Sequence, residues 1–364
     1  MRTSVLLLAS LLFTSVLSLA ATADPKEVQQ ILKDAVDNQR TVGIVVGIID
    51  ANGQTIFSCG KTAADGRSID GDTVFEIASV TKTFTATLLA DMVKQGLVKL
   101  DDPVAKFLPE NVKVPARGGK EITLLDLATH RSGLPRLPTN WAPANPLNPY
   151  ADYTAERLFA FLSSYALPRD IGASFEYSNL GAGLLGEALA CKAGKSYEVL
   201  LTERILRPLG MDSTGIAFRP EISARLATGH FSGLAPAMNW DASVLAGCHA
   251  IHSTANDMLK YIAAYMGLKN SPLAGAMAMA RQDVRDTDAP NLRIGLAWHI
   301  LKLPDASIVW HNGGSFGYHS FAGFDLKKEM GVVVLSNCMN DIDDIGLHLL
   351  NDRIPLTMIE PKKQ

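Results

Sequence analysis

The sequence predicts an α+β fold in which both ends of the chain contribute to one antiparallel β-sheet. Strand-like runs occur near the start, in "TVGIVVGIID" and "QTIFSCG", and return near the end, in "IGLAWHI", "ASIVWHNG", "HSFAGFDL" and "GVVVLSN". The patterns between these two groups are mostly helical or irregular. Runs of strands separated from runs of helices are typical of α+β proteins. We therefore expect a sheet flanked by N- and C-terminal helices, with a mostly helical region inserted in the middle.

The individual elements follow from local signals. Asp24 and Pro25 predict a helix start, because aspartate caps helix N-termini and proline fits the first helical position. The Asn52-Gly53 pair predicts a hairpin between the first two strands. Apolar residues at helical spacing predict a helix over residues 79–95, and a last helix is expected over residues 341–351.

These elements suggest two subdomains within residues 24–364. A sheet subdomain is expected from about 24–77 and 286–364, and a helical subdomain from about 78–285. The stretch "GLPRLPTNWAPANPLNPY" is too rich in proline for a helix or a central strand. Such a stiff, irregular segment suits the rim of a cleft.

The N-terminus indicates export. Arg2, the apolar run "VLLLASLLFTSVLSL" and the small residues Ala21-Thr22-Ala23 have the form of a signal peptide over residues 1–23. The apolar run is shorter than the roughly 20 residues that a membrane span needs. We expect a periplasmic or secreted protein with no membrane span after cleavage.

Composition limits the possible partners. The 364-residue chain has a formal net charge of −3, and its lysines and arginines are scattered, which argues against a nucleic-acid partner. Its four cysteines could form up to two disulfides, but small buried thiols are the favoured reading. Oligomeric state and disulfide pairing stay open.

Ser79 and Lys82 are the first candidates for chemistry. Residues three apart on a helix share a face, so the Lys82 amine can reach the Ser79 hydroxyl and take its proton. The N-terminus of a helix also favours a developing anion. A Ser-x-x-Lys pattern recurs at Ser58 to Lys61, where the serine lies in a strand-like run, so the spacing alone does not identify a nucleophile.

Two further groups strengthen the first. Tyr177 and Asn179 form a Tyr-x-Asn in "SFEYSNLG", where an ammonium beside the phenol would favour its ionised form. The Asn179 amide could hold both Lys82 and a substrate amide. A buried tyrosine beside a helix start is the alternative reading of this pair.

The third group is the strand that ends at His311, Asn312, Gly313 and Gly314. Glycines let an extended substrate lie against a strand backbone. The N–H of Gly314 could pair with that of Ser79 as an oxyanion hole.

The order Ser-x-x-Lys, Tyr-x-Asn, then a basic-residue-x-Gly strand resembles the serine β-lactamase and penicillin-binding protein superfamily, and its class C β-lactamase branch in particular. The phrases "ATHRSGLP", "RPLGMDST" and "STANDMLKYI" resemble internal landmarks of that family. The resemblance covers residues 25–350.

The resemblance implies a β-lactamase/transpeptidase-like fold with the site between its two parts. It implies that Ser79 is acylated, that Lys82 and Tyr177 transfer protons, and that Asn179 positions Lys82 and substrate. It also implies that residues 311–314 bind a small-molecule or peptide acyl substrate. No metal or organic cofactor is implied.

His311 departs from the family pattern, which has lysine-threonine-glycine in the third motif. A lysine there would be a permanent cation for a substrate carboxylate, whereas histidine is largely neutral at pH 7. We therefore expect a β-lactam, a D-alanyl peptide or a small ester as substrate, without choosing among them.

Two other functions compete with this one. "GGSFG" at residues 313–317 fits the Gly-x-Ser-x-Gly elbow, with Ser315 as nucleophile, but the elbow needs a following helix and "YHSFAGFDL" alternates like a strand. A penicillin-binding receptor or scaffold of the same fold, acylated without turnover, is the other alternative.

Overall fold

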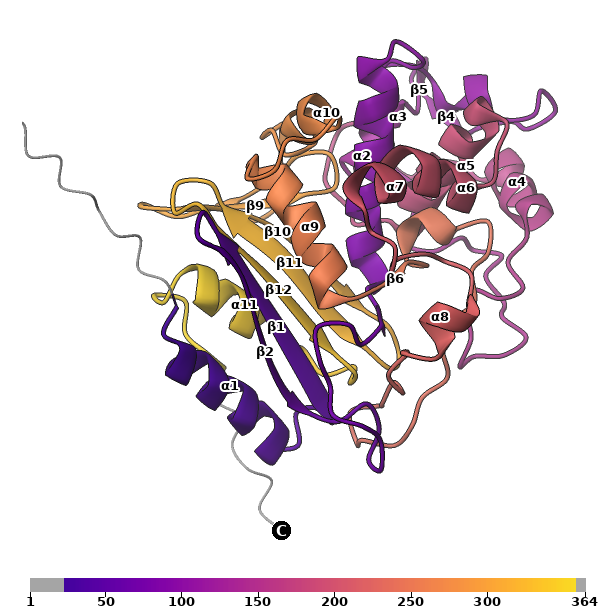
Figure 1. The fold of residues 1–364 in the computed structure, drawn as a ribbon. Helices are drawn as coiled ribbons and strands as arrows, with labels where there is room; N and C mark the ends of the chain where they lie inside the picture. The colour runs from indigo at the N-terminus through magenta and orange to yellow at the C-terminus, as the bar shows by residue number, and fades with distance from the viewer. Residues whose placement is uncertain (1–22, 358–364) are drawn as a thin grey trace, which may run out of the picture.

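The computed structural model describes residues 23–357, so the predicted signal peptide lies almost entirely outside the described residues. The predicted fold class is confirmed: an antiparallel sheet carries helices on both faces, and a helical region lies to one side (Figure 1). Within the described part, the main sheet has eight strands in the order β2-β1-β12-β11-β10-β9-β8-β7. These strands are β1 (Gly43–Asp50), β2 (Gly53–Gly60), β7 (Arg285–Asp286), β8 (Leu292–Ile294), β9 (His299–Lys302), β10 (Ser307–Gly314), β11 (His319–Asp325) and β12 (Met330–Ser336).

The N-terminal strand β1 joins the two ends of the chain. It pairs with β2 through a hairpin and with β12 on its other side, with Ile44 opposite Ser336. Its side chains alternate between two cores, as the period of a strand requires. Ile44 and Val46 pack under α1 (Pro25–Asp37) and α11 (Asp343–Leu350), whereas Val45 faces the larger core that contains α9 (Ala255–Met266).

The ends of the first and last helices follow their capping residues. Asp24 caps α1 as predicted, because its side chain accepts a hydrogen bond from the N–H of Lys26. The last helix begins at Asp343, two residues later than predicted, and Asp341 lies before it with its side chain accepting a hydrogen bond from the Asp343 N–H.

The remaining helices lie mostly in the inserted region. They are α2 (Thr81–Lys94), α3 (Leu124–Ala128), α4 (Ala155–Ser164), α5 (Asn179–Ala193), α6 (Tyr197–Leu201), α7 (Arg207–Leu209), α8 (Pro220–Ser223) and α10 (Ala274–Ala280). Two short strand pairs accompany them, β3 (Phe75–Glu76) with β6 (His252–Ser253) and β4 (Ala116–Arg117) with β5 (Lys120–Glu121).

The helix predicted over residues 79–95 is shorter than expected and more deeply buried. A single 3₁₀ turn, η1 (Ala78–Val80), precedes α2, which ends at Lys94. Most of α2 is buried on every side, including three threonines whose hydroxyls are hydrogen-bonded. Figure 1 shows this helix standing upright behind the outer helices of the inserted region. No helix between residues 23 and 357 is long and apolar enough to cross a membrane.

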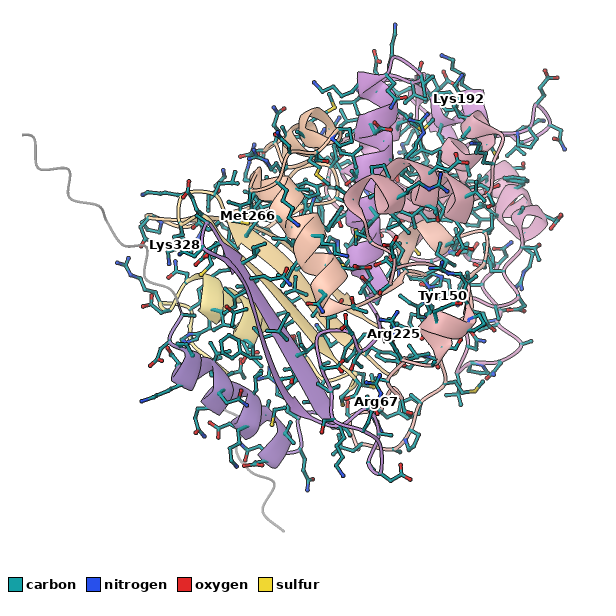
Figure 2. All side chains as sticks on the ribbon, in the orientation of Figure 1. Arg67, Tyr150, Lys192, Arg225, Met266 and Lys328 are labelled. Carbon is teal, nitrogen blue, oxygen red and sulfur yellow. The ribbon has the colours of Figure 1, made fainter. Side chains whose placement is uncertain are left out.

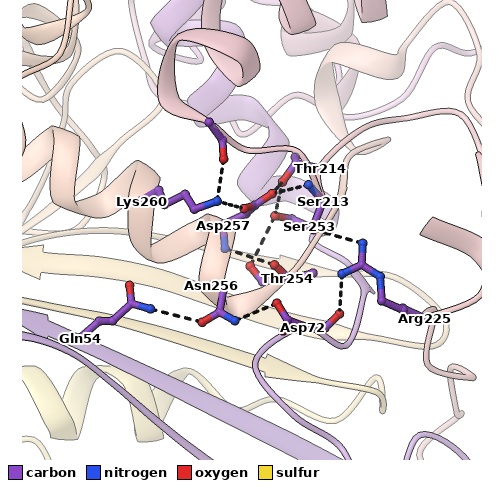
Figure 3. Close-up of polar contacts among 11 residues, drawn as sticks. Gln54, Asp72, Ser213, Thr214, Arg225, Ser253, Thr254, Asn256, Asp257 and Lys260 are labelled. Atoms are coloured by element: carbon purple, nitrogen blue, oxygen red, sulfur yellow. Dashed lines mark hydrogen bonds and ion pairs between the residues drawn. The ribbon is translucent and has the colours of Figure 1, made fainter. Parts of the chain in front are cut away.

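A buried polar network joins two segments of the inserted region, and an exposed contact beside it reaches the sheet (Figure 3). Asp257, with a side chain 2% exposed, accepts hydrogen bonds from the Ser213 N–H and the Thr214 hydroxyl, each 2.8 Å long. Lys260 donates to the same carboxylate at 2.7 Å. At the edge, Gln54 of β2 donates to Asn256 at 3.4 Å. We call Asp257, Ser213, Thr214 and Lys260 the Asp257 network; it joins the "RPLGMDST" and "STANDMLKYI" phrases.

Candidate active site

Ser79 lies where β3 passes into α2. Ala78, just before it, has a left-handed backbone with φ of 43°, which turns the chain sharply at this point. Strand β10 passes close by: a Cβ at Gly313 would lie 2.2 Å from the Ile77 carbonyl oxygen and 2.8 Å from the Ser79 nitrogen. A glycine at position 313 is therefore required for the strand to approach Ser79.

Lys82 lies one turn into the helix, with its amine directed at Ser79. Its Nζ is 2.8 Å from the Ser79 Oγ and 2.8 Å from the Cys248 carbonyl oxygen, and the residue is 1% exposed. Ser79 itself is half-buried. The two predicted residues are thus in direct contact. The role of Cys248 could not be found from sequence, because a backbone carbonyl carries no residue signature.

Tyr177 precedes α5 and lies over Lys82. The centroid of its ring is 4.9 Å from the Lys82 Nζ and 4.6 Å from the ring of His130. The ring of His130 is fixed in turn, because the Ser178 N–H donates to its Nδ1. The structure brings Tyr177 to the Ser79 and Lys82 pair by ring contact.

Asn179 is the first residue of α5, but it does not contact Lys82 as expected. Its Nδ2 donates to the Tyr150 hydroxyl at 3.1 Å, while its Oδ1 is buried with no hydrogen-bond partner in the described structure. Lys82 is satisfied by Ser79 and Cys248 instead. The unpaired Asn179 oxygen is therefore free to accept a hydrogen bond from a ligand.

His311 is uncharged. It is fully buried on β10, and burial, together with the nearby His299 and Lys82, holds its pKa well below the ordinary 6.5. Its Nδ1 lies 2.6 Å from the Asn312 carbonyl oxygen, so this nitrogen carries the proton and donates. Its Nε2 is buried without a partner in the described structure. Its ring centroid is 6.3 Å from that of Tyr177.

The side chains of β10 divide between the two faces of the sheet. His311 and Gly313 face Ser79 and Tyr177, whereas the Asn312 side chain points the other way and donates to Asp343 of α11. Gly314 is exposed, and a Cβ there would meet only His319, at 3.9 Å. Of the predicted β10 group, Asn312 is the residue whose side chain lies apart from the others.

A group of aromatic residues lies next to Asn179, and nothing in the sequence indicated that they would lie at the site. Tyr150, from the proline-rich segment, stacks on His249 at 3.9 Å and contacts Trp240 at 5.3 Å between ring centroids. Trp240 in turn meets Phe316, just after β10, at 5.0 Å. Figure 2 shows Tyr150 on the helical side of the molecule, far from Lys328 at the opposite end of the sheet. These rings form an apolar wall between α5 and the end of β10.

The two competing serines lie in different settings. Ser58 is on the edge strand β2, where residues three apart point to opposite faces, so it does not share a face with Lys61. Ser315 lies between β10 and β11, so a strand follows it where the nucleophile elbow needs a helix. Neither serine therefore has the setting that its sequence motif requires.

One group of described residues has the composition of a metal site, but each member already has a structural role. The ligand atoms of His319, Asp341 and Asp343 lie within 4.8 Å of one another. His319 Nε2 lies 3.0 Å from Asp343, however, and the Asp341 side chain accepts a hydrogen bond from the Asp343 N–H. The four cysteines lie within the described residues and are all unpaired; two are buried, one is partly buried and one is exposed.

Comparisons with known proteins agree with this arrangement. The chain matches the Beta-lactamase family model over residues 28–352. It is 31% identical over 354 residues to the D-alanyl-D-alanine-carboxypeptidase/endopeptidase AmpH of Escherichia coli, covering 90% of each chain. It is 25% identical to a beta-lactamase of the same organism, covering 91% of this chain and 93% of that protein.

Solved structures show the same fold. The beta-lactamase/D-alanine carboxypeptidase of Yersinia pestis superposes with a TM-score of 0.77 at 26% identity, covering 90% of this chain and 98% of the other. The class C beta-lactamase of Rhodobacter sphaeroides has a TM-score of 0.77 at 24% identity, covering 90% and 99%. The family model and the relatives match most of the chain, and the Lys82 amine contacts the Ser79 hydroxyl at the start of a buried helix. The chain therefore belongs to the beta-lactamase family and is a serine hydrolase.

Proposed function

We propose that this protein is an exported hydrolase that cleaves a D-alanyl peptide, a β-lactam or a small ester through an acyl-enzyme on Ser79. The observation that carries the proposal is the 2.8 Å contact between the buried Lys82 amine and the Ser79 hydroxyl. A serine hydroxyl is a weak nucleophile unless a base lies within hydrogen-bonding reach. Lys82 is such a base.

In the first step, the Ser79 oxygen attacks the substrate carbonyl carbon and its proton passes to the Lys82 amine. The Cys248 carbonyl supports this, because it accepts one N–H of the amine and so orients the lone pair toward Ser79. The N–H groups of Ser79 and Gly314 would hold the oxyanion. The close approach of Gly313 to Ser79 is consistent with that pairing.

In the second step, the bond to the leaving group breaks, and the leaving group takes a proton from Lys82 or Tyr177. Water, activated by the same residues, then releases the acyl group and restores the Ser79 hydroxyl. The unpaired Oδ1 of Asn179 would accept an N–H of a substrate amide, and residues 311–314 would lie along the substrate. The apolar wall of Tyr150, Trp240 and Phe316 suits an apolar acyl group.

Two findings support the choice of substrates and compartment. The relative with 31% identity is a D-alanyl-D-alanine carboxypeptidase/endopeptidase, and other relatives are beta-lactamases. The N-terminal sequence, with Arg2 and its apolar run, supports export to the periplasm or the medium.

The test is turnover and adduct formation with three probes: a D-Ala-D-Ala peptide, nitrocefin and p-nitrophenyl acetate. We expect multiple turnovers of at least one probe and an acyl adduct on Ser79 by mass spectrometry. Ser79→Ala should lower turnover about a thousandfold or more while circular dichroism stays unchanged. The matched control is Ser58→Ala, which removes the hydroxyl of the other Ser-x-x-Lys and should leave the rate within about twofold.

Two outcomes would reject the proposal. Loss of activity in Ser58→Ala but not in Ser79→Ala would mean that the wrong serine was chosen. A burst of one equivalent followed by no turnover would identify the non-turnover penicillin-binding receptor instead.

A further inference from the structure

Arg136 is a cation at the active site that the proposed mechanism does not use. It lies in the "GLPRLP" stretch, and its guanidinium carbon is 5.2 Å from the centroid of the Tyr177 ring. The Lys82 amine is 4.9 Å from the same centroid. Tyr177 therefore has two basic side chains close to its ring.

The backbone that carries Arg136 is fixed to the start of α5. The Leu180 N–H donates to the Arg136 carbonyl at 3.1 Å, and the Ser178 hydroxyl donates to the Pro135 carbonyl at 2.6 Å. Because Ser178 and Leu180 flank Asn179, the loop and the Tyr-x-Asn motif form one rigid unit. The backbone of Arg136 is therefore held beside the residue that follows Tyr177.

The positive charge of Arg136 is not neutralised by the protein. The residue is exposed, and within residues 23–357 no carboxylate pairs with it and no acceptor receives a hydrogen bond from its guanidinium. The other nearby basic groups differ in this respect. Lys82 is bonded to Ser79 and Cys248, and His311 is uncharged.

We propose that Arg136 binds a carboxylate on the leaving-group side of the substrate. The inference rests on the acyl-transfer function proposed above. A guanidinium presents paired N–H donors that match the two oxygens of a carboxylate. The leaving-group side is favoured because Arg136 lies against Tyr177, one of the two residues that would protonate the leaving group. His311 on β10 is uncharged, so it cannot serve as the cation that binds the substrate carboxylate. Among the described residues, Arg136 is placed to bind it.

The test uses two esters of N-benzoylglycine, the 3-carboxyphenyl ester and the phenyl ester. Both form the same acyl-enzyme, so their deacylation is identical, and they differ by one carboxylate in the leaving group. We expect Arg136→Gln to lower kcat/KM about tenfold for the carboxylated ester, mainly through KM, and to change the phenyl ester by less than about twofold. Arg136→Lys should recover part of the loss.

The matched control is Arg67→Gln, which removes the same charge from the exposed loop after β2 and should affect neither ester. Equal losses for both esters in Arg136→Gln would reject carboxylate binding, because a role through Tyr177 would affect them alike. An unchanged kcat/KM for both would also reject it. If wild-type protein turned over neither these esters nor the three probes above, the proposed function itself would fail.

Discussion

The Asp257 network and the cluster around Lys82 are both buried and polar, yet they are satisfied to very different degrees. Both oxygens of Asp257 accept hydrogen bonds, from backbone, hydroxyl and ammonium donors. Around Lys82, several buried atoms have no partner in the described structure: Asn179 Oδ1, His130 Nε2, His299 Nδ1 and His311 Nε2. An unpaired buried polar group costs about 1–3 kcal/mol. The comparison indicates that the first cluster stabilises the fold, while the second retains hydrogen-bonding capacity for a ligand.

The largest change in stability is expected from Asp257→Ala. The substitution leaves the Ser213 N–H, the Thr214 hydroxyl and the Lys260 ammonium without their shared acceptor, so the free energy of unfolding should fall by about 3 kcal/mol. Urea unfolding measures this. The control is Asp212→Ala, which removes an exposed carboxylate one residue before Ser213 and should cost under about 0.5 kcal/mol. Equal losses in the two variants would contradict the role assigned to the network.

A smaller, pH-dependent effect is expected from His299→Phe. Burial, with a contribution from Lys82, lowers the pKa of His299 from 6.5 to about 4. Between these values the unfolded chain binds more protons than the folded chain, so the free energy of unfolding falls as the pH drops below 6.5. Each such histidine contributes up to about 1.4 kcal/mol per pH unit.

The measurement is urea unfolding at pH 7 and pH 5 for both proteins. His299→Phe should lose about 1–2 kcal/mol less than wild type over that interval. Some acid sensitivity should remain, because burial also lowers the pKa of His249 to about 3 and that of His252 to about 4. An identical loss in both proteins would show that His299 is not buried as a neutral ring.

The smallest effect is expected at the exposed contact between Gln54 and Asn256, beside the Asp257 network. Gln54 reaches Asn256 through a 3.4 Å hydrogen bond on the surface, where water can replace either partner. Gln54→Ala should therefore change the free energy of unfolding by less than about 0.5 kcal/mol, again by urea unfolding. A loss comparable to that of Asp257→Ala would mean that the network extends as one unit to the surface.

The fold was predictable because its signals are local and repeated. Strands β1, β10 and β12 are rich in β-branched residues, short turns join β10 to β11 and β11 to β12, and Asp24 caps the helix that follows it directly. Burial of the threonine face of α2 was not predictable, since a polar face looks solvent-exposed until the tyrosines of α9 that bond it are in place.

The candidate site was predictable only where the chemistry depends on spacing. Ser79 and Lys82 meet because one helical turn brings them together. Ser58 and Lys61 have the same spacing, but Ser58 lies on a strand. Only the surrounding structure therefore distinguishes this Ser-x-x-Lys from the one at Ser79. Cys248 could not be predicted because it contributes a backbone carbonyl. Tyr150 could not be predicted because an irregular, proline-rich segment has no periodicity from which the direction of a side chain could be inferred. The direction of Asn312 depends on the pleat of β10.

The pairing of β1 with β12 has a consequence for how the chain folds. Ile44 is opposite Ser336, so nearly the whole chain separates the two partners in sequence. Until the late strands are available, β1 therefore has one edge without its native partner. During that interval an unpaired apolar strand is open to association with other chains. The late strands should therefore govern aggregation during expression, and truncation before residue 330 should leave β1 without its native neighbour.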